Sequence, residues 1–167
     1  ALLMPTAVAA KTAKQSSKKS AAAPASVPTA LQPLLQARSQ LVDFNASAFP
    51  YRGFLPGSTK PFLDVRDGGK RGHTNLRGDV FWETPTYNDR RSLVYLPPGF
   101  DAQKPALIVL YLHGQGATLE RDVVGRQGVP RQLAESQRNM ALVAPQLAVD
   151  AADSSAGNFW KPGHFAA

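Results

Sequence analysis

One short segment combines residue types that could contact a reacting group. Residues 105–112 form a continuous apolar run, and His113-Gly114-Gln115-Gly116 follows it directly. Glycine carries no side chain, so a backbone that contains it can approach a ligand closely. The segment is therefore a candidate ligand-contacting loop. An ordinary turn between a strand and a helix is the alternative interpretation of Gly114 and Gly116.

The residues around this segment argue against several common cofactor and metal sites. A dinucleotide-binding loop needs a third glycine at a fixed spacing, which Gly114-Gln115-Gly116 lacks. A phosphate loop of the Gly-Lys-Ser/Thr type does not occur in the sequence. His73, His113 and His164 lack the spacing of metal ligands, and there is no cysteine for a thiolate site or a disulfide. We therefore expect neither a metal nor a cofactor.

The elements that must position the loop are indicated by apolar patterning. The run over 105–112 is typical of a strand buried on both faces of a parallel sheet. Residues 130–138 predict a helix with Pro130 in its first turn, and residues 140–145 predict a second buried strand. Strand, helix and strand form a βαβ unit with a right-handed crossover. The candidate loop then lies at the carboxyl end of the first strand.

Strand patterning also precedes this unit. Residues 73–83 (HTNLRGDVFWE) and 92–96 (SLVYL) predict two strands, and the polar residues 86–90 between them predict a turn. We therefore expect an antiparallel hairpin that leads into the parallel strands. The predicted fold class is α/β, with a mixed sheet.

The residues before this hairpin are expected to form a helix and a loop. Apolar residues recur at helical spacing from Leu31 to Val42, which predicts a helix over about 31–44. Residues 46–72 are rich in Gly, Pro and charged residues, which predicts an irregular loop. The sequence thus divides at residue 71 into an N-terminal helix and loop, over 31–71, and the main domain, over 72–167.

The main domain resembles the α/β-hydrolase family. The resemblance rests on the His113-Gly114 turn after a buried strand and on residues 91–100 (RSLVYLPPGF) upstream of it. Secreted bacterial esterases, lipases and feruloyl-esterase-like enzymes are the members that it is similar to. The resemblance covers residues 72–167 and implies that they are the N-terminal part of a hydrolase sheet.

The resemblance implies roles for four residues of the loop. In this family the loop supplies one backbone N–H to the oxyanion hole, which stabilises the negative charge that develops on the ester carbonyl oxygen. By that pattern the donor is the N–H of Gln115. Gly114 and Gly116 shape the loop, and His113 supports it rather than transferring protons.

The same resemblance exposes a missing part. The family carries its nucleophile in a Gly-x-Ser-x-Gly elbow after the strand at 140–145, followed in the chain by an acid and a histidine. No Gly-x-Ser-x-Gly occurs in the 167 residues. His164 precedes any such elbow, so it does not fit the catalytic histidine. We therefore expect a truncated domain whose Ser, acid and His lie beyond residue 167, and a chain that is inactive alone.

Residues 1–30 predict a tail rather than part of the domain. Ala7-Val8-Ala9 fits the small-x-small pattern of signal-peptide cleavage, so the start is interpreted as a signal-peptide remnant of a secreted or periplasmic protein. The apolar stretch is too short to span a bilayer. Residues 11–30 predict a disordered basic linker. Four lysines and no acid put +4 of the net charge of +7 in this tail, which argues against a nucleic-acid site on the domain.

Two functions are compatible with these features. The first is a fragment of a serine hydrolase that acts on a small or polymeric carboxylic ester. The alternative is a hydrolase-like module that binds a cell-wall or carbohydrate ligand without turning it over. Asp150 and Asp153 are interpreted as loop-capping acids, although a substrate or ion could also meet them. Residues 159–165 supply aromatic side chains for a pocket or, as we expect, for packing against the sheet edge.

Overall fold

A computed structural model describes residues 33–164 of the chain. The signal-peptide remnant and the basic linker expected over 1–30 lie outside the described residues. The described part is a mixed α/β fold with few helices and a mixed sheet, which confirms the predicted class at that level. None of the helices in residues 33–164 is long and apolar enough to cross a membrane.

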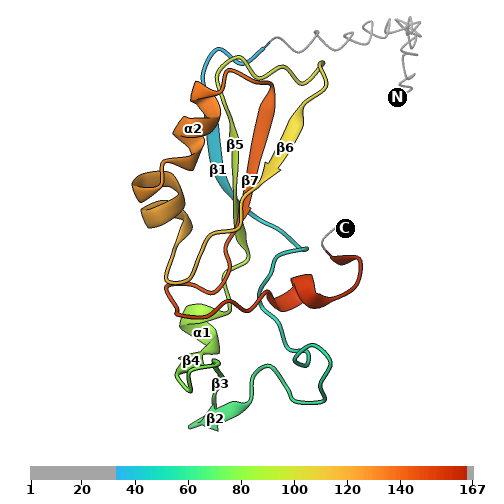
Figure 1. The fold of residues 1–167 in the computed structure, drawn as a ribbon, viewed down its shortest axis with the longest axis vertical. Helices are drawn as coiled ribbons and strands as arrows, with labels where there is room; N and C mark the ends of the chain where they lie inside the picture. Colours follow the sequence, from blue (N-terminus) through green and yellow to red (C-terminus); the bar gives the residue numbers. More distant parts are fainter. Residues whose placement is uncertain (1–32, 165–167) are drawn as a thin grey trace, which may run out of the picture. The chain divides into compact units, whose positions relative to one another are not determined.

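The larger sheet has four strands in the order β1-β5-β7-β6 (Figure 1). β1 pairs with β5 and β5 with β7 in antiparallel fashion, whereas β6 and β7 are parallel. Their bounds are Arg38–Asp43 for β1, Arg91–Leu96 for β5, Leu107–Leu110 for β6 and Met140–Pro145 for β7. The parallel pair and its crossover are the βαβ unit that the sequence predicts.

The crossover from β6 to β7 contains two helices on one face of this sheet (Figure 1). The helix α2 (Val129–Glu135) has Pro130 in its first turn, as predicted. A π-helix, η1 (Leu119–Arg126), precedes it and was not predicted. Alternate residues of β5 and β7 face these helices and form one core with them, as expected for strands with side-chain period two. That core contains Leu93, Tyr95, Leu119, Val123, Val129, Leu133, Leu142 and Ala144.

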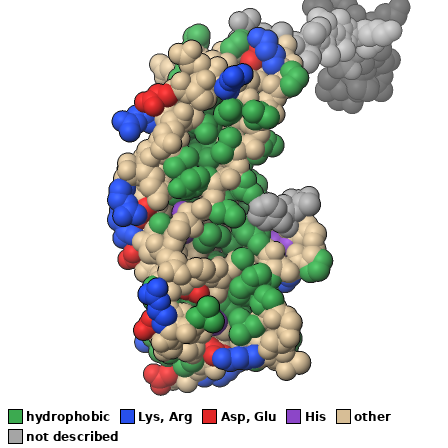
Figure 2. Space-filling view, in the orientation of Figure 1, with side chains coloured by type: hydrophobic (Ala, Val, Ile, Leu, Met, Phe, Trp, Pro, Cys, Tyr) green, Lys and Arg blue, Asp and Glu red, His purple; other side chains and the backbone are tan. Residues whose placement is uncertain are grey.

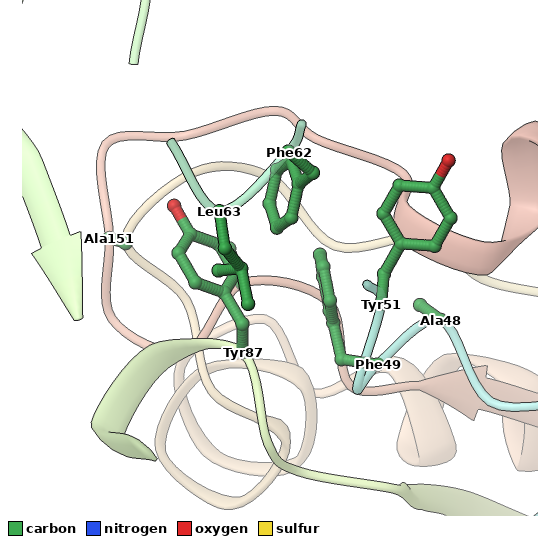
Figure 3. Close-up of a cluster of buried hydrophobic side chains, with 8 residues drawn as sticks. Ala48, Phe49, Tyr51, Phe62, Leu63, Tyr87 and Ala151 are labelled. Atoms are coloured by element: carbon green, nitrogen blue, oxygen red, sulfur yellow. The ribbon is translucent and has the colours of Figure 1, made fainter. Parts of the chain in front are cut away.

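A second sheet has three antiparallel strands in the order β2-β3-β4, with bounds Val65–Asp67, Lys70–Thr74 and Val80–Trp82. A single helical turn, α1 (Glu83–Thr86), follows it. A second core of aromatic side chains lies close by, with Phe49, Phe62 and Tyr87 grouped together (Figure 3). The ring centroids of Tyr87 lie 5.1 Å from Phe49 and 5.0 Å from Phe62.

The helix predicted over 31–44 is wrong, because residues 38–43 form strand β1. Each β1 residue pairs with one of β5, and Leu41 lies opposite Leu93 of the core. The apolar residues of this segment are spaced as in a helix. The segment forms a strand instead because β5, which is distant in the chain, supplies its hydrogen bonds and partly buries its apolar side chains. The irregular loop predicted over 46–72 also contains β2 and the first residues of β3.

The predicted hairpin between 73–83 and 92–96 is wrong as well. Residues 70–82 are themselves a hairpin, β3 and β4, with a turn at 75–79. Strand β5, which confirms the strand predicted over 92–96, pairs with β1 and β7 in the other sheet. A glycine in the turn, Gly78, adopts a φ of 89°, which glycine tolerates without strain.

The strand predicted over 105–112 exists as β6, but it is not buried on both faces in the described residues. β6 lies at an edge of the sheet, and Leu107 and Ile108 are 62% and 74% exposed. Apolar side chains also gather on the sheet face seen in Figure 2, which the crossover helices do not cover. A shallow groove on that face is lined by Phe44, Leu110, Val143 and Phe159, among others.

Candidate functional site

The candidate loop lies beyond the carboxyl end of β6, beside the residues that follow β7 (Figure 1). The parallel pairing continues past the strand, because the Tyr111 N–H donates to the Val143 carbonyl over 2.9 Å. The Gly116 N–H then donates to the Ala151 carbonyl over 2.8 Å. The edge where parallel strands end is the usual location of ligand sites in α/β sheets.

His113 ties the loop to the segment after β7. It is buried, and its Nε2 accepts hydrogen bonds from the Leu147 N–H at 2.9 Å and the Gln146 amide at 2.8 Å. Because both partners are donors, Nε2 carries the lone pair and Nδ1 carries the proton. Nδ1 accordingly donates to the Gly114 carbonyl over 2.9 Å. Both ring nitrogens of His113 therefore form hydrogen bonds that hold the loop.

Gln146 is the second anchor of the loop, and sequence reasoning missed it. Its side chain is 1% exposed, and its Oε1 accepts the Leu119 N–H over 3.0 Å. Its amide donates to His113 and, over 3.3 Å, to the Ala117 carbonyl. A polar residue directly after a buried strand was the available signal, since a buried amide must find partners.

The two glycines of the loop have different structural requirements. Gly116 has a φ of 68°, a left-handed conformation that favours glycine. Its carbonyl accepts a hydrogen bond from Arg121, whose guanidinium also pairs with Asp150 at 2.9 Å. Gly114 has no positive φ, and a Cβ placed on it would have no atom within 4 Å. The fold itself therefore does not require a glycine at 114.

Gln115 offers a free backbone donor. Its N–H has no acceptor among residues 33–164, although the residue is exposed at the loop. Its side-chain amide instead donates to the Ser154 hydroxyl over 2.6 Å. The side chain is thus tied to the neighbouring loop, while the backbone N–H stays available for a ligand.

Gln115 lines a cleft of about 520 Å³. The walls come from the β3–β4 hairpin, from residues 152–155 and from separate side chains of Leu55, Lys60 and Trp160. Trp160 belongs to η2 (Gly157–Trp160) and packs edge-on against Tyr51 and Phe62, with ring centroids 5.5 and 5.8 Å apart. Trp160 therefore lines a pocket, and it packs against the aromatic core rather than against the sheet edge that the sequence suggested.

Asn75 holds the β3–β4 turn against this cleft. Its Oδ1 accepts the N–H groups of Arg77 and Asp79, each over 2.9 Å. Its amide donates to the Asp79 carboxylate over 3.2 Å and to the Ala152 carbonyl over 3.0 Å. One buried side chain thus fixes the shape of the turn and attaches it to the opposite wall.

His73 contributes a polar atom to the cleft wall. Its Nδ1 lies 2.7 Å from the Phe62 carbonyl, which is an acceptor, so Nδ1 carries a proton. The Asp64 carboxylate lies 3.8 Å behind Nδ1. Burial would raise the pKa of Asp64, but hydrogen bonds from Lys60 and the Thr74 N–H outweigh it and hold the pKa below its ordinary value. Asp64 therefore stays charged behind the imidazole.

Asp153 serves as a structural acceptor in the wall of the cleft, as the sequence suggests for a capping acid. It accepts hydrogen bonds from the Tyr87 hydroxyl at 2.9 Å and from the Ser155 hydroxyl at 3.0 Å. Burial, with the nearby Asp153 charge, raises the pKa of Tyr87 well above its ordinary value. The phenol therefore remains a donor throughout the physiological pH range.

Comparison with known proteins gives no functional assignment, so a proposal must rest on the geometry of the site. No family model, curated protein or solved structure matches this chain. Within residues 33–164, no three His, Asp or Glu side chains gather in a group that could hold a metal ion.

Proposed function

We propose that residues 72–164 are the oxyanion-loop part of a serine hydrolase of the α/β-hydrolase kind, which acts on carboxylic esters outside the cytoplasm. The observation that carries the proposal is the free Gln115 N–H. It lies in a loop held from behind by His113 and Gln146, at a cleft beyond the carboxyl end of a parallel strand. A rigid unpaired donor at a cleft is what stabilisation of a developing oxyanion requires.

The proposed chemistry divides between this chain and residues outside it. A serine hydroxyl attacks the ester carbonyl carbon while a histidine takes its proton, and the carbonyl oxygen becomes negatively charged. The Gln115 N–H holds that oxygen until the alcohol leaves. The serine, the histidine and its orienting acid are proposed to lie beyond residue 167, because the 167 residues contain no nucleophile elbow.

The free edge of β6 supports this division. An oxyanion hole combines the loop N–H with the N–H that follows the nucleophile, so the two strands that end there must be neighbours. One side of β6 is occupied by β7, which leaves the other side for the strand with the nucleophile. Two apolar residues of this edge strand, Leu107 and Ile108, are also exposed on the faces of the sheet. Soluble proteins do not normally leave such an edge uncovered.

A fluorophosphonate probe, which reacts covalently with activated serines, tests the proposal. The natural full-length protein should be labelled on one serine and should hydrolyse p-nitrophenyl esters with saturation. The 167-residue chain alone should show neither. An unlabelled, inactive full-length protein would reject the enzyme and favour the non-catalytic binding module. Saturable turnover by the 167-residue chain would reject the proposed division of the site.

A further inference from the structure

The β3–β4 turn presents two side chains that the fold does not use. Leu76 is fully exposed, and the guanidinium of Arg77 forms no ion pair or hydrogen bond with any residue in 33–164. Both line the cleft that contains Gln115. A single exposed leucine usually needs no explanation. Here, however, the four hydrogen bonds of Asn75 fix the backbone of the turn that carries both residues at the cleft.

His73 adds a polar atom to the lining of the cleft. His73 is 5% exposed, and its Nε2 forms no hydrogen bond with a residue in 33–164. Because Nδ1 donates to the Phe62 carbonyl, Nε2 is the ring nitrogen that remains for another partner. This ring nitrogen is therefore available to a ligand or to water in the cleft that His73 lines.

The charges around the cleft favour a singly charged anion. Lys60 lines the cleft but is neutralised by Asp64, with which it pairs at 2.9 Å. The carboxylate oxygens of Asp153 accept hydrogen bonds from Tyr87 and Ser155. Arg77 is therefore the charged group there that still lacks a partner. Guanidinium groups bind carboxylates in bidentate fashion, whereas the Asp153 charge disfavours a doubly charged phosphate.

The rest of the cleft offers apolar surface beside this cation. The half-buried Trp160 ring lines it, together with Leu55 and Leu76. The Trp160 ring is held by contacts with Tyr51 and Phe62, so it is a preformed surface. Rigid aromatic surfaces bind flat apolar groups at low entropic cost.

We propose that this cleft binds a carboxylate attached to an apolar ring, with Arg77 contacting the carboxylate and Trp160 and Leu76 contacting the ring. That this ligand is part of the ester substrate rests on the proposed function; the binding site does not. The inference makes Arg77 a specificity-determining residue: esters whose bound part carries a separate carboxylate are preferred over their uncharged analogues.

A pair of isosteric probes tests the inference. The natural full-length protein is titrated with 2-naphthoate and, separately, with uncharged 2-naphthamide. The change in naphthalene fluorescence measures the binding of each probe. Naphthoate should bind about tenfold more tightly, since a hydrogen-bonded charge pair contributes about that factor. Arg77→Gln should abolish the preference without affecting naphthamide. Arg38→Gln removes the same charge from exposed strand β1 and should leave the preference intact.

Each other outcome has a definite meaning. Equal binding of the two probes, or no binding of either, would overturn the inference. A preference that survives Arg77→Gln would place the carboxylate elsewhere and also overturn it. Fluorophosphonate labelling is scored separately. An Arg77-dependent preference in a protein without a labelled serine would keep the inference and reject the proposed function.

Discussion

Gln115 acts through two groups that a mutation can separate. Its side chain binds the Ser154 hydroxyl, while its backbone N–H is the proposed oxyanion donor. Replacement by alanine removes only the first interaction, which is exposed, and replacement by proline removes the second. The pair of variants therefore distinguishes a contribution of the side chain from one of the backbone.

In the natural full-length protein we expect Gln115→Ala to change kcat little. Gln115→Pro should lower kcat about a hundredfold or more, the usual loss for one oxyanion donor. Steady-state kinetics with a p-nitrophenyl ester measures both effects. Ser154→Ala is the matched control, because it breaks the same side-chain bond and leaves residue 115 unchanged. A folded Gln115→Pro protein with normal kcat would remove Gln115 from the site.

The sequence indicated the loop itself but few of its contacts. The His113-Gly114-Gln115-Gly116 segment was identifiable because an apolar strand precedes it and glycine is a strong local signal. The hydrogen bonds of Gln146 and Asn75 were not identifiable, because their partners are distant in the chain. Gln146 is 29 residues from Ala117, and Asn75 is 77 residues from Ala152. A residue's chemical type is local information, whereas its partner depends on the folded topology.

At the level of elements, local patterning succeeded where segments close in sequence pack together. β7 was predicted with its full bounds, and α2 was predicted from Pro130 and its surroundings, because β6, α2 and β7 form one compact unit. β1 was mistaken for a helix because its pairing partner β5 is about fifty residues away. The second sheet was predicted only in part: the strand expected over 73–83 contains β4 and the end of β3. Its strands are three to five residues long, which is too short for a clear period.

The junction between η1 and β7 depends on Gln146, which leads to a prediction about stability. Gln146→Leu keeps the side-chain volume but leaves the buried Leu119 N–H without an acceptor and removes the amide bonds to His113 and the Ala117 carbonyl. Each buried unsatisfied group costs about 1–3 kcal/mol. We expect the free energy of unfolding of the full-length protein, measured by urea denaturation, to fall by about 2–4 kcal/mol.

The matched control is Gln132→Leu, which removes one exposed hydrogen bond to the Gln127 carbonyl. Exposed substitutions of this kind usually change stability by less than about 0.5 kcal/mol. Equal stability of the two variants would show that Gln146 does not hold the loop. A fall in kcat with Gln146→Leu beyond the loss of folded protein would link the same bonds to the position of Gln115.

At the level of the whole described domain, the two edges of the larger sheet differ in chemistry. The edge at β1 carries Arg38, Ser39 and Gln40, all exposed and polar, which is typical of an edge that faces water. The edge at β6 carries Leu107, Ile108 and Leu110, all exposed and apolar. The first edge is protected against pairing with another chain, and the second is not. The asymmetry is the pattern expected if further structure covers β6 in the intact protein.

The variant Ile108→Lys tests whether further structure covers β6. It should have opposite effects in the isolated 167-residue chain and in the full-length protein. In the isolated 167-residue chain the wild-type edge should cause self-association and bind hydrophobic dyes, and a lysine there should reduce both, because a charge blocks edge pairing. If a strand with the nucleophile covers β6 in the full-length protein, as proposed, the same lysine is buried there in an apolar layer. There it should lower the stability by on the order of 3 kcal/mol and reduce Tm.

Sedimentation velocity and thermal melts of both proteins measure the two effects, and Gln40→Lys on β1 is the control. Gln40 is already exposed at a polar edge, so its replacement should change neither association nor Tm appreciably. If Ile108→Lys left the full-length protein as stable as Gln40→Lys does, β6 would be a true edge strand there. No strand with a nucleophile could then lie beside the Gln115 loop, and the hydrolase proposal would fail on geometry alone.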